Sequence, residues 1–357
     1  MHRFLLTTGG TAGHVFPALA VAEELRRRHP DAALCFVGSK DGPEGAMAAH
    51  RGIPFKGLPA RGFLGKGFRS LGAILPMGKA MVQAMGIVRE FSPSVAAGFG
   101  GYAAFAAMGA AWACRVPLVL HEQNAVMGTA NRFMARVCRR VCVSLPGTDG
   151  VSAAKRVVTG NPVREGIVRV GAAPRNFGTR RLLVMGGSQG ARFLNGRLPG
   201  MLKRFAKEGV EIRHQAGRRE EEATRRAYVE AGWDGDAVCG FIEDVAEAYA
   251  WADLALCRAG ASTVAELCAA GLPAVLVPFP FAIHDHQTLN ARVLEASGAA
   301  RLLPQNACGE EVLGDLVLEL LGDPERRREM SEAALGLARP DAASLVADAL
   351  EMSEKNR

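Results

Sequence analysis

Apolar runs of strand length alternate with amphipathic stretches of helical period along most of the chain. In the first half, the pattern predicts strands at residues 3–8, 33–38, 94–98, 117–121 and 141–145. In the second half, it predicts strands at residues 181–185, 210–215, 237–241, 253–257 and 274–278. Helices are expected in the gaps, the first of them at 15–28. Such alternation is typical of βα units, so the predicted fold class is α/β, with parallel sheets covered by helices on both faces.

Two glycine-rich segments, almost half the chain apart, repeat one pattern. Residues 5–13 read LLTTGGTAG and residues 182–190 read LLVMGGSQG. A strand that runs into such a turn and then into a helix opens a doubly wound nucleotide-binding domain, so two Rossmann-like domains are predicted. The first is expected at 1–163 and the second at 164–340, with a candidate hinge at 160–164 where Gly, Asn and Pro interrupt the pattern. The helix predicted at 341–357 is expected to pack back on the first domain.

The composition excludes several classes of protein. The chain has 357 residues, of which 49% are hydrophobic and 22% charged, which rules out a disordered chain and a polytopic membrane protein. Residues 95–114 carry no charge over a length that could span a bilayer, but they are rich in Ala and Gly and contain no Leu or Ile. A buried segment is therefore predicted there. The apolar run at the N-terminus is too short for a secretory signal, so the expected site of action is the cytosol.

The net charge of +7 and the basic isoelectric point favour anionic partners such as phosphates, nucleic acid or an acidic membrane surface. Residues 61–79 interleave large apolar residues with bases, which is typical of a membrane-surface patch, although a buried loop with solvated lysines fits the same pattern. Aromatic residues make up only 6% of the chain, too few for a convincing nucleic-acid platform. No nucleic acid is expected as a partner.

The sequence predicts neither disulfides nor a metal site. The eight cysteines form no CxxC pair and are interpreted as reduced, mostly buried thiols. The run His284-Asp285-His286-Gln287 has the composition of a metal site but lacks a third spaced ligand. No metal and no cofactor are therefore expected.

Three glycine turns that follow strands are candidate anion sites. They lie at residues 9–13, 98–102 and 186–190, where backbone N–H groups and the start of the next helix can approach a phosphate. Neither of the two turns that open the domains, at 9–13 and 186–190, has the spacing of a P-loop or of GxGxxG, so ATPase and dinucleotide functions lose support. A tight turn with close packing explains each glycine cluster taken alone equally well.

Polar side chains near these turns are candidates for chemistry. His14 follows the first turn and has a ring suited to proton abstraction, although a lone histidine is often structural. Residues 121–124 end a strand at its carboxyl side, where open α/β sheets bind ligands. Residues 258–266 place hydroxyls at a helix start with Glu266 one turn later, which fits either a ribose-binding carboxylate or an ordinary capping box.

Taken together, these motifs resemble one family, the bacterial peptidoglycan N-acetylglucosaminyltransferases of the two-domain GT-B class, also called the MurG family. The resemblance spans almost the whole chain. The motifs are GGTAGH at 9–14, GFGGY at 98–102, HEQN at 121–124, GNPVR at 160–164, GGSQGAR at 186–192 and ASTVAE at 261–266.

The resemblance implies an inverting transfer of GlcNAc from UDP-GlcNAc to the C4 hydroxyl of undecaprenyl-pyrophosphoryl-MurNAc-pentapeptide, with no cofactor. It implies that the protein acts as a peripheral protein at the cytoplasmic face of the cell membrane, on an anionic surface, and it makes other cell-wall synthesis proteins candidate partners. The first domain is then expected to carry the acceptor and face the membrane, and the second to bind the donor.

The same resemblance implies roles for individual residues. His14 is expected to be the catalytic base or to position the acceptor. UDP-GlcNAc is expected to contact Thr11, Ala12, Gly13, Asn124, Arg164, Ser188, Ile242, Ala261, Ser262, Thr263, Glu266 and Gln287. The acceptor pyrophosphate is expected at Gly10, Gly100, Gly101 and Tyr102. Helix N-terminal amides after Ser188, together with Arg164, would stabilise the charge that develops on the departing diphosphate.

The sequence departs from the family's pattern at two places, and two other functions are also compatible with it. Ala12 stands where the family usually has Gly, and the run at 281–284 blurs the alignment before Gln287. The same architecture also serves UDP-GlcNAc 2-epimerases, and fold alone does not fix function. An epimerase predicts conversion of the donor without any acceptor, whereas a nucleotide-sugar sensor predicts binding with no release of UDP.

Overall fold

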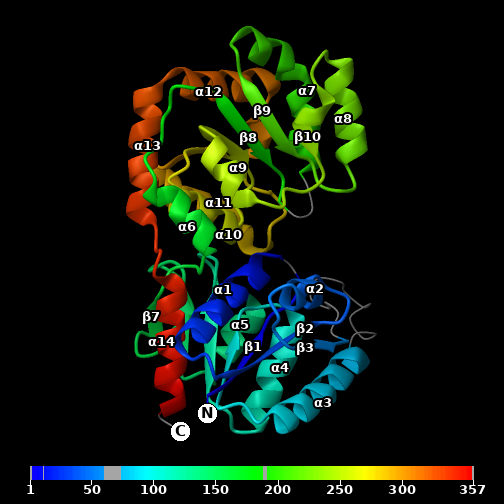
Figure 1. The fold of residues 1–357 in the computed structure, drawn as a ribbon, viewed down its shortest axis with the longest axis vertical. Coiled ribbons are helices and arrows are strands. Elements are labelled where there is room, and N and C mark those ends of the chain that lie inside the picture. The colour runs from blue at the N-terminus through cyan, green and yellow to red at the C-terminus, as the bar shows by residue number, and fades with distance from the viewer. Residues whose placement is uncertain (1, 11, 60–73, 188–190, 356–357) are drawn as a thin grey trace. The chain divides into compact units, whose positions relative to one another are not determined.

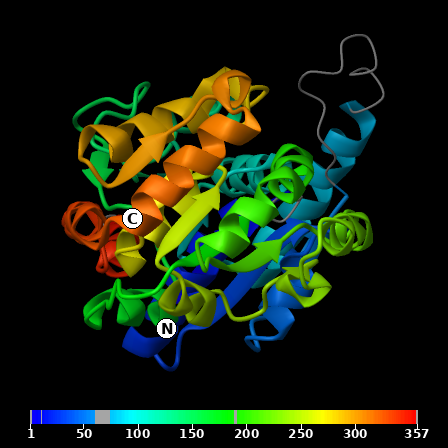
Figure 2. The ribbon, with the colours of Figure 1, turned by 90° about the horizontal axis from the view of Figure 1, so that it is seen from above.

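The chain forms two compact units. The computed structural model describes residues 2–10, 12–59, 74–187 and 191–355. Unit 1 comprises Met1–Arg164 together with Arg339–Arg357, and unit 2 comprises Glu165–Ala338. Each unit contains one parallel sheet, and its strands lie between helices (Figures 1 and 2).

The sheet of unit 1 has the strand order β3-β2-β1-β4-β5-β6-β7, and every pairing is parallel. The chain therefore reverses its direction of winding between β1 and β4, which is the switch point of a doubly wound sheet. Its strands are β1 (Arg3–Thr7), β2 (Ala33–Ser39), β3 (Phe55–Leu58), β4 (Val95–Gly98), β5 (Leu118–Glu122), β6 (Arg140–Val143) and β7 (Arg156–Val158).

Alternate residues of these strands face two separate cores. Leu5 packs against one layer of helices, whereas Phe4 and Leu6 pack against the other, as the two-residue period of a strand requires. The first layer contains α3 (Ile74–Phe91), α4 (Tyr102–Ala113) and α5 (Thr129–Met134). The second contains α1 (Ala12–Arg28), α2 (Glu44–Ala49) and α14 (Ala342–Lys355).

The C-terminal helix α14 packs on unit 1, beside α1 (Figure 1). Its apolar face, which includes Val346 and Leu350, is fully buried in the second core. The contact also has a polar side, because Arg28 at the end of α1 bonds to Asp348 at 2.6 Å and to Glu351 at 3.1 Å. The last helix of the chain thus completes the cover of the first sheet.

Unit 2 repeats the same winding, with the strand order β10-β9-β8-β11-β12-β13 and a switch point between β8 and β11. Its strands are β8 (Arg181–Met185), β9 (Glu211–Gln215), β10 (Val238–Cys239), β11 (Leu254–Cys257), β12 (Ala274–Leu276) and β13 (Ala300–Leu302). Its helices are α6 (Glu165–Ala172), α7 (Arg192–Lys207), α8 (Glu221–Glu230), α9 (Val245–Trp251), α10 (Ala261–Ala270), α11 (His286–Ala296), α12 (Glu310–Gly322) and α13 (Pro324–Leu337).

The predicted elements and the observed ones differ mainly at the sheet edges. The sequence pattern did not predict β3, β7 or β13, and β10 is shorter than the strand expected at 237–241. Residues 95–114 form β4, a glycine turn and α4, with most of their side chains buried. Within the described ranges, the helices are all too short or too polar to cross a membrane.

Candidate active site

In unit 1 the candidate residues gather where β1, β4 and β5 end. These three strands are neighbours, and their carboxyl ends meet at the switch point, where ligands bind in sheets of this type. The turn containing Gly9 and Gly10 follows β1, the turn containing Gly100 and Gly101 follows β4, and the HEQN run at 121–124 begins in β5. Side chains from three separate stretches of sequence therefore meet at one edge of the sheet.

The two glycine turns touch each other. Gly101 has φ +90°, and a Cβ atom there would come within van der Waals overlap of the Gly9 carbonyl oxygen. Gly100 has φ +97°, and a Cβ atom there would stand 3.1 Å from Cε1 and Nδ1 of His14. Close packing therefore requires glycine at both positions, whatever these turns bind.

His14, in the first turn of α1, lies at one end of a buried chain of polar groups. Its Nδ1 is 3.1 Å from Oε1 of Gln123. The Gln123 Nε2 donates to the Phe99 carbonyl oxygen at 2.8 Å and lies 3.2 Å from Nδ1 of His121. The His121 Nε2 is 3.0 Å from the Gly160 carbonyl oxygen. Burial lowers the pKa of His121 to about 4, so its ring is neutral at physiological pH.

Glu122 organises the loop that carries Asn124. Its buried carboxylate accepts hydrogen bonds from the backbone and side-chain N–H groups of Asn124 at 3.0 and 3.1 Å. It also accepts from the Gly128 backbone at 3.2 Å and from the Asn131 side chain at 2.8 Å. Four N–H donors thus satisfy this buried charge and fix the position of Asn124.

A second buried carboxylate holds the first glycine turn. Glu44, at the start of α2, is fully buried and accepts a hydrogen bond from the Gly10 backbone N–H at 2.9 Å. The Gly10 amide, which is expected to bind the acceptor pyrophosphate, therefore donates to a carboxylate in this structure. Sequence reasoning missed Glu44, because no motif links residue 44 to residue 10.

The remaining candidates of unit 1 flank this edge. Arg164 stacks its guanidinium over the Phe16 ring, with 4.3 Å between the charge centre and the ring centroid. Tyr102 is the first residue of α4 and is half-buried, and Gly13 lies in the first turn of α1. Thr11 and the side chain of Ala12 lie outside the described residues.

In unit 2 the candidates lie at the equivalent switch point, where β8 and β11 end. The helix α10 begins at Ala261 directly after Gly260, which has no side chain to cap it, so the capping box considered for this sequence is not formed. Ser262 and Thr263 occupy its first turn and are half-buried. Glu266 is nine-tenths buried, and its Oε2 accepts a hydrogen bond from the Tyr249 hydroxyl at 3.0 Å.

Of two further candidates of unit 2, Ile242 lies in a loop and Gln287 lies in the first turn of α11. Ile242 is half-buried between β10 and α9. The Gln287 Oε1 accepts a hydrogen bond from the Phe279 backbone N–H at 3.0 Å, while His284 and Asp285 before it have positive φ angles. Ser188 lies outside the described residues, as does the part of the basic apolar segment at 60–73.

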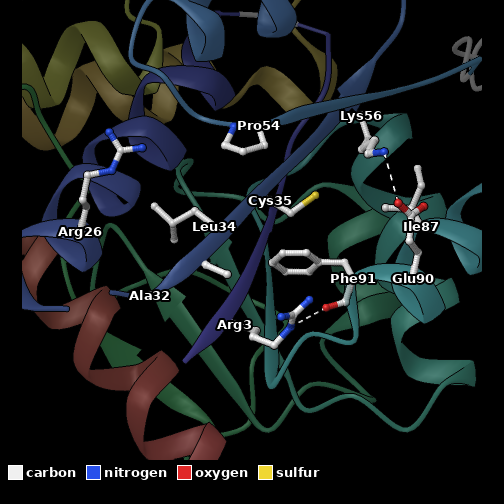
Figure 3. A pocket seen from close by; sticks show the side chains of 11 residues that line it. Arg3, Arg26, Ala32, Leu34, Cys35, Pro54, Lys56, Ile87, Glu90 and Phe91 are labelled. Atoms are coloured by element: carbon white, nitrogen blue, oxygen red, sulfur yellow. Dashed lines mark hydrogen bonds and ion pairs between the residues drawn. The ribbon is translucent and has the colours of Figure 1, made fainter. Parts of the chain in front are cut away.

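A surface pocket of about 460 Å³ in unit 1 lies at the amino-terminal ends of β1 and β2, opposite the ends where the candidate residues gather (Figure 3). Its charged side chains already have partners. Arg3 donates from Nε to the Phe91 carbonyl oxygen at 2.6 Å, and Lys56 pairs with Glu90 at 3.7 Å. The residues that line this pocket include none of the candidate site residues.

The described residues offer no cluster of three His, Cys, Asp or Glu side chains that could hold a metal ion. Six of the eight cysteines are buried, and burial raises their pKa values, for example to about 11 for Cys35.

Comparison with known proteins places this geometry in a family. Residues 4–143 match the family model described as "Glycosyltransferase family 28 N-terminal domain". Residues 181–346 match the model described as "Glycosyltransferase family 28 C-terminal domain". The chain belongs to glycosyltransferase family 28, and the two-domain GT-B fold predicted from its motifs is confirmed.

Full-length relatives narrow the comparison further. A protein of Nitratidesulfovibrio vulgaris (strain DP4) is 50% identical over 98% of this chain and 97% of its own length. It is named "UDP-N-acetylglucosamine--N-acetylmuramyl-(pentapeptide) pyrophosphoryl-undecaprenol N-acetylglucosamine transferase". A protein of Pseudomonas aeruginosa (strain LESB58) with the same name is 47% identical over 97% of both chains.

Solved structures agree with these relatives. The crystal structure of Acinetobacter baumannii MurG superposes with a TM-score of 0.76 and 35% identity, covering 99% of this chain and all of that one. A UDP-N-acetylglucosamine 2-epimerase superposes with a TM-score of 0.70 but is only 14% identical, so it shares the fold alone.

Proposed function

We infer that this protein is a UDP-GlcNAc-dependent glycosyltransferase that makes the lipid-linked disaccharide precursor of peptidoglycan. It transfers GlcNAc from UDP-GlcNAc to the C4 hydroxyl of undecaprenyl-pyrophosphoryl-MurNAc-pentapeptide. The acceptor oxygen attacks C1 of GlcNAc, the bond from C1 to the diphosphate breaks with inversion, and UDP leaves. Two relatives whose names state this transferase activity support the assignment, since each is 50% identical to this protein over 98% of the chain.

The reaction needs a group that takes the proton of the acceptor hydroxyl, and we propose that His14 is this base. The observation that supports the role is its position. His14 lies at the carboxyl edge of the first sheet, with its ring against Gly100 and its Nδ1 held by Gln123. A histidine takes up a proton near neutral pH, which suits a general base.

Replacement of His14 tests this role directly. His14→Ala is expected to lower kcat by about 10²- to 10⁴-fold, the usual range for loss of a general base, with little change in the KM for UDP-GlcNAc. The rate is measured as acceptor-dependent release of UDP. An unchanged kcat removes His14 from the role, and a raised KM for the acceptor alone makes it an acceptor-positioning residue.

The donor is proposed to bind mainly to unit 2, as the family resemblance implies. Glu266 is proposed to accept hydrogen bonds from the ribose hydroxyls, and the backbone N–H groups that begin α10, with those of the motif at 186–190, to bind the diphosphate. The burial of Glu266 and its bond to Tyr249 support this role, because a fixed carboxylate can accept two hydroxyl hydrogens. Glu266→Gln is expected to raise the KM for UDP-GlcNAc about tenfold or more with a smaller effect on kcat. An unchanged KM contradicts the assignment.

Unit 1 is proposed to carry the acceptor and to rest on the cytoplasmic, anionic face of the cell membrane as a peripheral protein. The net charge of +7 and the basic apolar run at 61–79, which leads into α3, support this. Binding to vesicles that contain anionic lipid is expected, weakening as salt is added. Equal recovery with neutral and anionic vesicles, or no effect of salt, overturns the proposal.

A further inference from the structure

Two backbone carbonyl oxygens that contact the chain of polar groups behind His14 decide where its hydrogens lie. The Gly160 carbonyl oxygen can only accept a hydrogen bond, so the His121 Nε2 at 3.0 Å must carry a hydrogen. The Phe99 carbonyl oxygen can likewise only accept, so the Gln123 group 2.8 Å away must be the NH₂ end of the amide. The orientation of the Gln123 amide follows from its own contacts.

The positions of the remaining hydrogens are then determined one after another. His121 is 1% exposed, and its neutral ring carries hydrogen on Nε2, so its Nδ1 accepts the second hydrogen of the Gln123 NH₂ group at 3.2 Å. The Oε1 of Gln123 therefore faces His14, and it can only accept. The His14 Nδ1, 3.1 Å away, must donate to it.

We propose that Gln123 and His121 are positioning residues that hold His14 as the Nδ1–H tautomer and so keep the lone pair of its neutral ring on Nε2, the atom that takes the acceptor proton. The proposal rests on the function proposed for His14. Under this proposal, Gln123 and His121 of the HEQN motif act through His14 and do not contact the substrate themselves.

The chemistry of the step agrees with this arrangement. When His14 Nε2 takes the hydroxyl proton, the ring becomes an imidazolium that carries a hydrogen on both nitrogens. Its Nδ1–H keeps the same bond to Gln123 Oε1, so no other group has to move. An amide oxygen orients the ring as the carboxylate does in a Ser-His-Asp triad but adds no negative charge beside it.

Packing limits the alternatives open to these side chains. Gln123 is 3% exposed, and the centroids of the His121 and Phe99 rings are 5.6 Å apart. On the other side, the His14 ring lies against Gly100. A flip of the Gln123 amide would place its oxygen against the Phe99 carbonyl oxygen and leave buried polar groups without hydrogen bonds, which is unfavourable.

The tautomer can be observed directly by NMR of the full chain labelled with ¹⁵N-histidine, with the His14 signals assigned by their loss in His14→Ala. The expected spectrum of the neutral ring has Nδ1 protonated and Nε2 unprotonated. In Gln123→Met, which keeps the volume and removes both ends of the amide, the Nε2–H form is expected to appear. A wild-type ring with hydrogen on Nε2, or an unchanged tautomer in Gln123→Met, overturns the proposal.

Kinetics supply a second readout. Gln123→Met is expected to lower kcat about 10- to 100-fold, the range for partners that orient a functional group, while the KM for UDP-GlcNAc stays within about twofold. His121→Phe is expected to cost less, because the Phe99 carbonyl still holds the amide. In a His14→Ala background, Gln123→Met is expected to have no further effect on kcat. An additional loss there, equal to that in wild type, assigns Gln123 a structural role only.

A matched control exists in unit 2, where Asn195 and the buried His214 form a similar network. The Asn195 Nδ2 donates to the Ala216 carbonyl oxygen at 3.0 Å, and its Oδ1 lies 3.0 Å from Nε2 of His214. Asn195→Leu is expected to destabilise the protein without altering the His14 nitrogen signals. A changed His14 tautomer in this variant contradicts the local origin of the effect.

The outcomes separate the two proposals. If His14→Ala retains wild-type turnover, the base function fails, and the positioning role in catalysis fails with it. If His14→Ala is inactive but Gln123→Met keeps both the wild-type tautomer and wild-type turnover, only the positioning role is overturned and His14 remains the base.

Discussion

The geometry around His14 depends on a position that has no side chain. Gly100 lies in the turn after β4 at φ +97°, and a Cβ there would stand only 3.1 Å from Cε1 and Nδ1 of the His14 ring. The glycine is needed for two independent reasons, the backbone conformation and the close approach of the ring.

Gly100→Ala should therefore damage both stability and turnover. The positive φ costs about 1–2 kcal/mol, and the contact with the ring displaces His14, which we expect to lower kcat by about tenfold or more. Thermal unfolding and acceptor-dependent UDP release measure the two effects. The matched control is Gly196→Ala in α7, where nothing lies within 4 Å of the new Cβ and stability should rise by up to about 1 kcal/mol. Wild-type kinetics in Gly100→Ala would contradict the described packing.

At this scale the sequence could indicate the motif residues but not the contacts that hold them. The types and spacing of His14, Asn124 and Glu266 suggested candidate chemistry before any fold was known. Their roles remain predictions. The partners of these residues depend on where strands and helices meet in space, so Glu44 and the Tyr249 hydroxyl could not be predicted.

Among the elements, α14 packs on α1 through its apolar face and through polar contacts in which Arg28 has the most partners. Arg28 bonds to Glu24 in its own helix and reaches across to Asp348, Glu351 and Ser344 in α14. A partly buried cation with several charged partners stabilises more than an exposed pair does.

Arg28→Met should loosen α14. A loss of about 2 kcal/mol corresponds to roughly 30-fold faster hydrogen exchange of the amides of this helix. The neighbouring Arg27 provides the control, because it is exposed and pairs with Glu24 within its own helix. Arg27→Met should change exchange by about twofold at most. Equal exchange of α14 in the two variants would show that the apolar contact alone holds the helix.

The elements missed by the pattern share a physical cause. The strands β3, β7 and β13 have only three or four residues. Each is the outermost strand of its sheet, so within the described residues it pairs with a neighbouring strand on one side only. Their apolar periodicity is too brief to distinguish them from loops. The longer central strands, such as β1 and β8, were predicted to within a residue because both faces are buried and the runs are continuously apolar.

At the scale of the whole molecule, each unit contains a buried neutral histidine. Burial lowers the pKa of His214 in unit 2 to about 3 and that of His121 in unit 1 to about 4. The unfolded chain has histidine pKa values near 6.5, so below that pH it binds protons that the folded protein does not. Stability therefore falls as pH falls from about 6.5 toward 4, by up to about 1.4 kcal/mol per pH unit for each histidine.

His214→Gln isolates one of these contributions. The variant should be less stable than wild type at pH 7, because it loses hydrogen bonds to Asn195 and Tyr228, but it should lose less stability between pH 7 and pH 5. Urea unfolding followed by tryptophan fluorescence is suitable, since Trp233 and Trp251 lie in unit 2. Parallel pH profiles of the two proteins would show that His214 does not contribute.

The transferase reaction is tested by the release of UDP from UDP-GlcNAc, measured with and without a MurNAc-pentapeptide pyrophosphoryl lipid. The product is identified by mass. We expect release of UDP only when the acceptor is present, with one disaccharide formed for each UDP. Release or conversion of UDP-GlcNAc without acceptor would contradict it and indicate a hydrolase or an epimerase on the same fold.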